Sequence, residues 1–239
     1  MSAITGYIIH LERATARAAH VAELIATLPC PAEIVPAVDA DALSPADRAR
    51  YDTSARLRPR YPFPLAETEI AVFLSHRAAW DRIAGGTSEA GLIIEDDVAL
   101  EPDTFDRAFD LALAHASDES WIRLPWKPRE TPAQMVAEDA PARLFYPRRV
   151  ALGMQAQIVG RRAAERLLTA TERFDRPVDT TLQMTWHTGV TPMVVWPSGI
   201  HDISADLGGS TLSKRPRSTS QRLLAEVKRG WYRAALALR

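Results

Sequence analysis

The sequence predicts an α/β fold, a mixed sheet flanked by helices, because apolar runs of strand length alternate with segments of helical periodicity. Residues 7–11 form a first apolar run, residues 14–28 carry apolar side chains at helical spacing, and residues 33–38 form a second run. A strand, a helix and a strand in this order favour a right-handed parallel crossover. The 239 residues are enough for one large domain with an appendage.

Residues 40–67 interrupt this alternation. They are rich in Asp, Arg and Pro, so we expect a long irregular segment with a short helix near residues 45–51. Loops of this length in compact domains are usually functional or disordered. Thr68 is then placed to cap a helix that ends near Gly86, with Glu69 favourably placed in its first turn.

The remaining elements follow from the same two periodicities. Pro102 opens a helix with an apolar stripe through Leu113, because proline suits the first helical position. Residues 161–169 predict a further helix and residues 177–186 a short one, whereas residues 126–141 favour a loop because they are rich in proline and charge. Strands are expected at four apolar runs, residues 121–124, 144–146, 155–159 and 193–196.

The stretch most informative about function is residues 91–98, an apolar run that ends in Glu95, Asp96 and Asp97. Its length and its flanking glycine predict a buried strand, and open α/β sheets bind ligands at the carboxyl ends of such strands. Three adjacent carboxylates repel one another unless solvent, cationic side chains or a bound cation offset their charge. Mg²⁺ and Mn²⁺ prefer oxygen ligands, so the stretch fits a metal site, although an acidic loop explains the three acids equally well.

The helix before this strand carries a histidine among its aromatic residues. His76 shares a face with Phe73, Trp80 and Ile83, because these positions are three and four residues apart. We therefore expect His76 to be a buried, hydrogen-bonded histidine. Ser75 lies about 100° away around the helix axis.

The C-terminal segment differs from the rest in charge. Residues 1–212 have a net charge of −8 and residues 213–239 have +7, which suggests a domain and a basic tail. Residues 220–238 predict a basic amphipathic helix, which either binds an anionic membrane surface or docks on its own domain. The overall charge of −1 gives no argument for nucleic acid as a partner.

Cysteine usage and hydropathy indicate the compartment. Cys30 is the only cysteine, so no intrachain disulfide is possible and a reducing compartment is expected. The first residues lack the pattern of a signal peptide, and no apolar run approaches the ~20 residues that cross a bilayer. We expect a cytoplasmic protein, held peripherally on the inner face of the cytoplasmic membrane if the tail binds lipid.

Five motifs occur in an order that resembles a known family. They are Ile9-His10-Leu11-Glu12-Arg13 with Arg17, Ala37-Val38-Asp39-Ala40, Glu69-Ile70-Ala71-Val72-Phe73-Leu74-Ser75-His76 with Trp80, Ile93-Ile94-Glu95-Asp96-Asp97-Val98, and Pro177-Val178-Asp179. Together they resemble glycosyltransferase family 25, which includes bacterial lipopolysaccharide and lipooligosaccharide β-galactosyltransferases and collagen hydroxylysine galactosyltransferases. The resemblance spans about residues 4–205. The sequence departs from the family pattern at His10, where Asn is usual, at Ala71-Val72, and around residues 153–157.

The resemblance implies a GT-A-like fold that transfers a hexose, commonly galactose from UDP-galactose, with Mn²⁺ or Mg²⁺ and with inversion at the anomeric centre. It implies an acceptor that is a glycan or glycolipid of the cell envelope, such as lipopolysaccharide. A metal would stabilise charge on the departing diphosphate. By the same resemblance Asp97 would ligate the metal, Glu95 would face the ribose or the metal shell, and Asp96 would assist.

Further site residues follow from the resemblance. An inverting displacement needs a general base at the acceptor hydroxyl, for which Asp179 is the candidate, although Pro-Val-Asp-Thr-Thr suits a helix N-cap equally well. Arg13 and Arg17 would reach nucleotide or phosphate groups, or be ordinary surface arginines. Ser75 and His76 are assigned to the donor site with them.

Three alternatives remain open. A late histidine, His201 or His187, would complete the metal shell, or each is an ordinary loop histidine. Residues 208–211, followed by Lys214 and Arg215, fit either a mobile flap over the diphosphate or a linker. An inactive family member that serves as a membrane-surface glycan-binding or scaffold protein is the alternative function. A P-loop NTPase is disfavoured, because no glycine-rich phosphate loop occurs.

Overall fold

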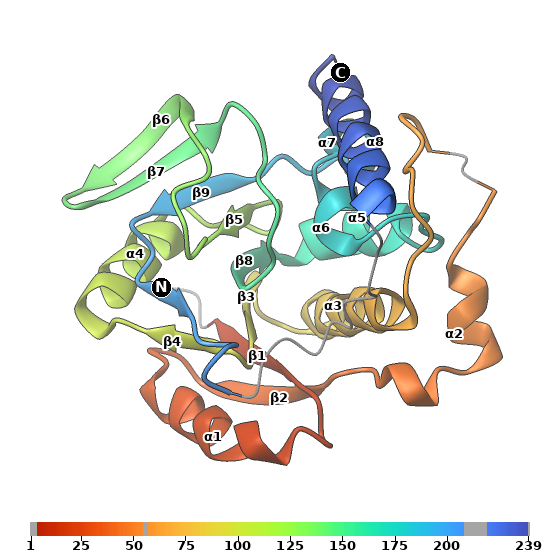
Figure 1. Cartoon of the computed structure of the whole chain (residues 1–239). Helices are drawn as coiled ribbons and strands as arrows, with labels where there is room; N and C mark the ends of the chain where they lie inside the picture. Colours follow the sequence, from red (N-terminus) through yellow and green to blue (C-terminus); the bar gives the residue numbers. More distant parts are fainter. Residues whose placement is uncertain (1–3, 55–56, 208–218, 239) are drawn as a thin grey trace.

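The computed structural model describes residues 4–54, 57–207 and 219–238 and confirms the predicted α/β fold (Figure 1). Within these residues, eight strands form one mixed sheet in the order β2-β1-β3-β8-β5-β9-β7-β6, and β4 pairs separately with β10. The strands are β1 (Thr5–His10), β2 (Ala32–Pro36), β3 (Ala90–Glu95), β4 (Val98–Leu100), β5 (Trp121–Arg123), β6 (Pro132–Asp139), β7 (Ala142–Pro147), β8 (Ala156–Gly160), β9 (Met193–Trp196) and β10 (Ile200–Asp202).

The directions of the central strands decide which loops meet. Strand β1 runs parallel to both β2 and β3, as the predicted crossover requires. Strand β8 lies antiparallel between β3 and β5, and β9 runs parallel to β5. Because β1 and β3 are parallel neighbours, the loops that follow them leave from the same edge of the sheet. That edge carries the residues after His10 together with the three acids after Ile94.

Helices pack on both faces of the sheet. They are α1 (Ala18–Thr27), α2 (Pro45–Arg50), α3 (Glu67–Gly85), α4 (Pro102–Ala114), α5 (Arg161–Ala170), α6 (Val178–Leu182), α7 (Thr185–Thr188) and α8 (Thr219–Ala237), with single 3₁₀ turns at Thr15–Arg17 and Ala40–Ala42. Ile93 of β3 packs in the core cluster with α3 and α5, whereas Leu92 and Ile94 pack with α1 and α4 on the opposite face. This strand is therefore buried on both faces, which fixes the position of its acidic end.

Helix α3 begins earlier than predicted. Its N-cap is Ala66, so the prediction that Thr68 caps the helix is wrong. The Glu69 carboxylate accepts a hydrogen bond from the Ala66 N–H at 2.7 Å, and this reach back to the cap position sets the start of the helix. The helix ends at Gly86 as predicted, and the short helix α2 also lies where it was expected.

The elements that the sequence did not predict correctly are exposed or very short. Strand β6 lies in the segment predicted to be a loop and forms an edge hairpin with β7. Met135 and Val136 are 44% and 37% exposed, so β6 has no apolar alternation to reveal it. Strands β4 and β10 have three residues each and were not predicted. The single short helix expected over residues 177–186 is two helices, α6 and α7.

Helix α8 docks on its own domain, one of the two alternatives for the tail (Figure 1). Tyr232 is buried, its hydroxyl accepts a hydrogen bond from Arg176 at 2.7 Å, and its ring meets that of Tyr61 edge to face at 5.4 Å. The apolar residues Val227 and Trp231 remain 50% and 76% exposed. None of the helices in the described residues is long and apolar enough to cross a membrane.

The predicted division into residues 1–212 and 213–239 falls where the structure gives no description. Residues 208–211, Lys214 and Arg215 lie outside the described residues. Whether this segment is a flap or a linker therefore stays open. The division into two domains therefore stays a prediction.

Candidate functional site

A cavity of about 240 Å³ lies at the shared edge where β1 and β3 end. Its polar lining residues are Arg13, Arg17, Thr68, Ser75, His76, Glu95, Asp96, Asp97, Gln155, Asp202 and Ser204. The structure thus brings together seven of the nine residues predicted for the site. The two that it places elsewhere are Asp179 and His201.

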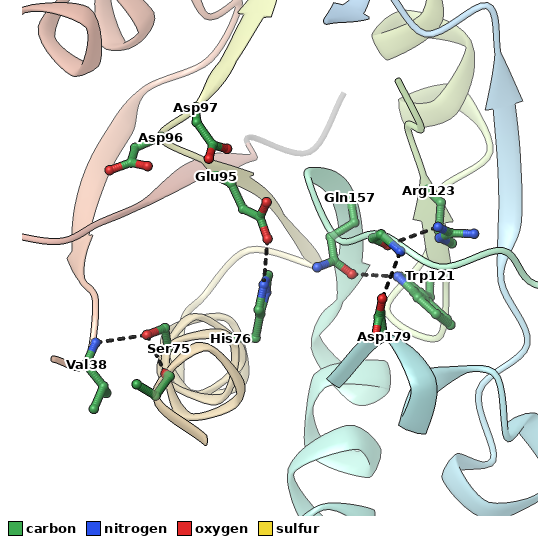
Figure 2. Close-up of polar contacts among 12 residues, drawn as sticks. Val38, Ser75, His76, Glu95, Asp96, Asp97, Trp121, Arg123, Gln157 and Asp179 are labelled. Atoms are coloured by element: carbon green, nitrogen blue, oxygen red, sulfur yellow. Dashed lines mark hydrogen bonds and ion pairs between the residues drawn. The ribbon is translucent and has the colours of Figure 1, made fainter. Parts of the chain in front are cut away.

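Backbone hydrogen bonds hold the acidic end of β3 in a defined position. The Glu95 N–H donates to the Gln155 carbonyl oxygen at 2.9 Å, and the Asp97 carbonyl accepts from the Ile203 N–H at 2.9 Å. Figure 2 shows Glu95, Asp96 and Asp97 at the end of the strand, with Glu95 pointing toward His76 on α3. The three carboxylates therefore point in different directions and have different neighbours.

Asp96 is the carboxylate of a buried ion-pair cluster. It is 6% exposed, and its two oxygens contact His10 Nδ1 at 2.6 Å and Arg17 Nη1 at 2.5 Å. Arg17 also donates to Asp97 at 3.2 Å. Because Arg17 is 5% exposed and engaged by both acids, it holds the acidic edge together and is not a surface arginine.

Asp97 is an acid whose pKa is shifted by its surroundings. Burial raises the pKa of Asp97 from 3.8 to about 6, and the negative charge of Glu95 is the second cause of this rise. The positive charge of Arg17 opposes the rise. The carboxylate of Asp202 adds to this rise. A bound cation would favour the ionised form of Asp97, and carboxylate oxygens are the donors that Mg²⁺ and Mn²⁺ prefer.

The carboxylates that the structure describes at this cavity are too few, in their present arrangement, to enclose a metal ion by themselves. Within the described part of the chain, no group of three or more His, Cys, Asp or Glu side chains has the arrangement to hold a metal ion. Mg²⁺ is commonly held by one or two carboxylates, with substrate phosphates and water completing its shell. The donor set therefore fits a hard cation that arrives with a phosphate-bearing ligand, and does not fit a permanently caged metal.

His76 is buried and hydrogen-bonded, as predicted. Its side chain is 1% exposed, and its Nε2 contacts the Glu95 carboxylate at 3.1 Å. The Ser75 hydroxyl accepts from the Val38 N–H at 2.9 Å and donates to the Ala71 carbonyl at 2.8 Å, so it ties the loop after β2 to α3. Both residues line the cavity, but these contacts already engage the Ser75 hydroxyl and one nitrogen of His76.

Two polar atoms at this cavity are buried without a partner. They are Thr68 Oγ1 and His76 Nδ1, which make no hydrogen bond with any residue that the structure describes. Buried polar atoms are nearly always paired with protein, water or a ligand. Their presence in the wall of the cavity is therefore typical of a site that binds a polar ligand.

Arg13 lies at the mouth of the cavity. Its side chain is 56% exposed and forms ion pairs with Asp39 at 2.7 Å and Asp41 at 3.2 Å. These partners belong to the Ala37-Val38-Asp39-Ala40 motif and its neighbour, so two of the sequence motifs meet here. Arg13 is therefore much more accessible to a ligand than Arg17, which is 5% exposed.

His201 does not line this cavity. It lies on β10, is 60% exposed and approaches Glu101 at 3.6 Å. Its neighbour Asp202 lines the cavity instead, because pairing of β10 with β4 brings Asp202 opposite Val98. His187 is also elsewhere, since its Nε2 contacts the Ala170 carbonyl at 3.0 Å. Sequence reasoning missed Asp202 because neither of the two short strands was predicted.

Asp179 lies on α6, beyond Gln157 as seen from Glu95 (Figure 2). Its carboxylate accepts hydrogen bonds from the Gly153 N–H at 3.3 Å and the Thr180 hydroxyl at 3.2 Å. Burial raises the pKa of Asp179, while Thr180 and Gly153 oppose the rise. The cap of α6 is Pro177, so the alternative in which Asp179 is the N-cap is wrong.

Comparison with known proteins identifies the family. The profile of Glycosyltransferase family 25 (LPS biosynthesis protein) matches residues 3–182, which include the four motifs around the cavity and the one that contains Asp179. The chain belongs to glycosyltransferase family 25. The family name describes enzymes that transfer a sugar from a donor to an acceptor.

Two curated relatives are similar to part of this chain. A "Glycosyltransferase 25 family member" of Anopheles gambiae is 38% identical over 101 residues, which cover 40% of this chain and 17% of the relative. A protein of the same description from Aedes aegypti is 35% identical over 101 residues, covering 40% of this chain and 16% of the relative. The matched part of the chain thus spans about a sixth of the length of these relatives.

The raised pKa of Asp97 predicts a pH-dependent stability. Because the folded protein binds this proton more tightly than the unfolded chain does, the free energy of unfolding should fall as pH rises from about 4 to about 6. The loss is at most about 3 kcal/mol, and Asp97→Asn should abolish it and be more stable than wild type at neutral pH. Urea unfolding in a chelator at both ends of the window measures the difference.

The matched control for this prediction is Asp81→Asn. Asp81 is an exposed acid on α3, and its substitution should leave the pH dependence of wild type intact. Parallel pH profiles for wild type and Asp97→Asn would contradict the prediction.

Proposed function

We propose that this family 25 glycosyltransferase has a GT-A-like fold and is a metal-dependent, inverting enzyme. In this proposal it transfers a hexose, galactose from UDP-galactose, to a cell-envelope glycan such as lipopolysaccharide. The observation that carries the proposal is the acidic cavity at the end of β3, where Glu95, Asp97 and Asp202 gather beside unpartnered polar atoms. A nucleoside diphosphate and a divalent cation together match its charge and its incomplete donor set.

Two carboxylates, those of Asp97 and Asp202, are proposed to hold the metal together with the phosphates of the donor. Asp97 would bind the metal directly, because burial and the charge of Glu95 disfavour its ionised form, which a cation would stabilise. Asp202 is favoured over His201 as a further ligand, since it lines the same cavity. Glu95, oriented by His76, would contact the ribose or the metal shell. When bound, Mn²⁺ or Mg²⁺ neutralises charge on the departing diphosphate.

The two arginines take different parts in this proposal. Arg13 would contact a nucleotide phosphate, because it lies at the mouth and is more than half exposed. Arg17 and Asp96 would act as positioning residues that keep the Asp97 carboxylate in place. Ser75 would likewise position the loop after β2, which lines the donor site.

Asp179 is proposed as the general base. A carboxylate with a raised pKa is a stronger base than an exposed one, and two hydrogen bonds hold it in a fixed orientation. Gly153, which donates to Asp179, lies two residues from Gln155, a lining residue of the acidic cavity. The base is thus connected to the donor site through one short segment.

Titration calorimetry of UDP with and without Mn²⁺ tests the donor site. Wild type should bind UDP at least tenfold more tightly with Mn²⁺, and Asp97→Asn should lose this gain because a neutral amide is a poor ligand for a hard cation. The exposed acid Asp81 supplies the matched control, and Asp81→Asn should behave as wild type does. UDP binding that is equally tight with and without metal would refute metal dependence.

The role of Asp179 predicts a change in turnover without a change in binding. Asp179→Asn should lower galactose release from UDP-galactose by about 10²-fold or more, because general base catalysis typically contributes that much. The dissociation constant for UDP with Mn²⁺ should stay within about twofold of wild type. A parallel loss of binding would show that Asp179 supports the fold or the donor site instead.

The exposed face of α8 supports peripheral membrane attachment. Val227 and Trp231 are one helical turn apart and exposed, so they form an apolar strip that points away from the domain. We expect binding to vesicles that contain phosphatidylglycerol, weakened by salt, and a loss of about tenfold or more in Val227→Ser/Trp231→Ser. Sedimentation with vesicles measures it.

The matched control for membrane binding is Met135→Ser/Val136→Ser. This pair removes two other exposed apolar side chains, from strand β6. Equal vesicle binding by both double variants and wild type would show that α8 is not the membrane contact.

A further inference from the structure

A second cavity, of about 670 Å³, lies between α8, the α6–α7 region and the loops around residues 61–63 and 147–152. Figure 1 shows α8 beside α6 and α7 on this side of the molecule. The volume falls in the range of about 300–1,000 Å³ that is usual for sites of small organic ligands. It is larger than the acidic cavity, and neither the family motifs nor the predicted site residues account for it.

This cavity is strongly basic. The arginines that line it are Arg129, Arg148, Arg149, Arg229 and Arg233, and no Asp or Glu of the described residues lines it with them. Arg229 has an ion pair with Glu226, whereas the other four have no carboxylate partner among the residues that the structure describes. Five like charges that line one cavity with so little compensation are favourable only when solvent or an anionic ligand faces them.

Aromatic rings form another part of its wall. Tyr61 meets Phe63 edge to face at 5.7 Å and Tyr232 at 5.4 Å, so these rings support one another. Trp186 on α7 also lines the cavity and is 45% exposed. Aromatic faces beside hydrogen-bonding groups suit a ligand that has both apolar ring faces and polar edges, as sugars do.

The second cavity adjoins the proposed base. Thr180 lines it, and the hydroxyl of Thr180 donates to Asp179. The segment around Gly153 contributes Leu152 to this cavity and Gln155 to the acidic one. Asp179 accepts from the Gly153 N–H between these two residues. A single short segment therefore connects both cavities at the side chain proposed to take the acceptor's proton.

We propose that the second cavity binds the acceptor and that this acceptor is a phosphorylated saccharide. The inference rests on the proposed function, because it assigns the second substrate of that reaction. Arginine guanidinium groups bind phosphate oxygens through two hydrogen bonds at once. Several of them around one cavity suit a ligand that carries at least two negative charges. The aromatic wall would hold the sugar rings, and the phosphate would fix which hydroxyl faces Asp179.

A membrane surface fits this cavity less well. A lipid headgroup layer meets a protein on convex, exposed faces, whereas these arginines line a concavity. The exposed apolar residues of α8, Val227 and Trp231, are not among its lining residues. The two faces of α8 thus serve different ligands, the outer one a bilayer and the inner one an acceptor.

Calorimetry with glucose 1,6-bisphosphate, on the full chain saturated with UDP and Mn²⁺, tests the inference. Wild type should bind the bisphosphate and should not bind glucose at the same concentrations. Arg149→Gln/Arg233→Gln should weaken this binding at least tenfold, while its binding of UDP shows that the variant is folded. The control Arg162→Gln/Arg166→Gln removes two exposed arginines of α5, which pair with Asp118 and Glu119, and should bind the bisphosphate as wild type does.

Other outcomes overturn the inference. Equal affinities in the two double variants, or displacement of the bisphosphate by UDP, would show that the probe does not occupy the second cavity. Binding of phosphatidylglycerol vesicles that depends on Arg149 and Arg233, without bisphosphate binding, would assign the cavity to lipid headgroups. If wild type binds the bisphosphate through these arginines but shows no metal-dependent UDP binding, the site for phosphorylated saccharides stands and the proposed donor chemistry fails.

Discussion

The buried ion pair between Arg17 and Asp96 is the interaction on which the acidic edge of the sheet depends. Three consecutive carboxylates at the end of a strand buried on both faces would otherwise repel one another at short range. Arg17 offsets the charge of Asp96, with His10 on its second oxygen, and also reaches Asp97. Because Arg17 precedes α1 and Asp96 follows β3, the pair joins two neighbouring connections of the sheet and leaves Glu95 and Asp97 directed at the cavity.

Elements buried on a regular face were predictable from the sequence, and exposed ones were not. The apolar run through Ile93 and Ile94 predicts β3, and both residues are buried in the core. The helical spacing of Phe73, Trp80 and Ile83 predicts α3, and these residues are buried as well. Strand β6 is exposed along its length and therefore carries no such pattern. For α8 the spacing predicted a helix but not its orientation: Arg176, fully buried, draws Tyr232 inward, and the apolar strip of Val227 and Trp231 faces outward.

Some residues of the site were likewise predictable from the sequence, and others were not. The sequence predicted that Glu95, Asp96 and Asp97 lie at the end of a buried strand, and there they line the acidic cavity. Asp202 was missed since its position depends on a three-residue pairing between segments about 100 residues apart in the chain. Sequence also could not separate residues that touch a ligand from residues that position others. Ser75 belongs to a signature motif, yet its hydroxyl is already engaged by Val38 and Ala71.

The opposite charges of the two cavities have a common physical explanation in the proposed reaction. A donor diphosphate and a phosphorylated acceptor are both anions, and they must come close enough for a hydroxyl to reach the anomeric carbon. In this proposal, carboxylates that recruit a cation would neutralise the donor, whereas Arg149 and Arg233, which have no carboxylate partner in the described part of the chain, would neutralise the acceptor directly. The proposed base, Asp179, must accept a proton, and its burial, which raises its pKa, favours that step. Segregating the two kinds of charge also disfavours binding of the acceptor in the donor site, because the acidic cavity repels an anion that arrives without a metal.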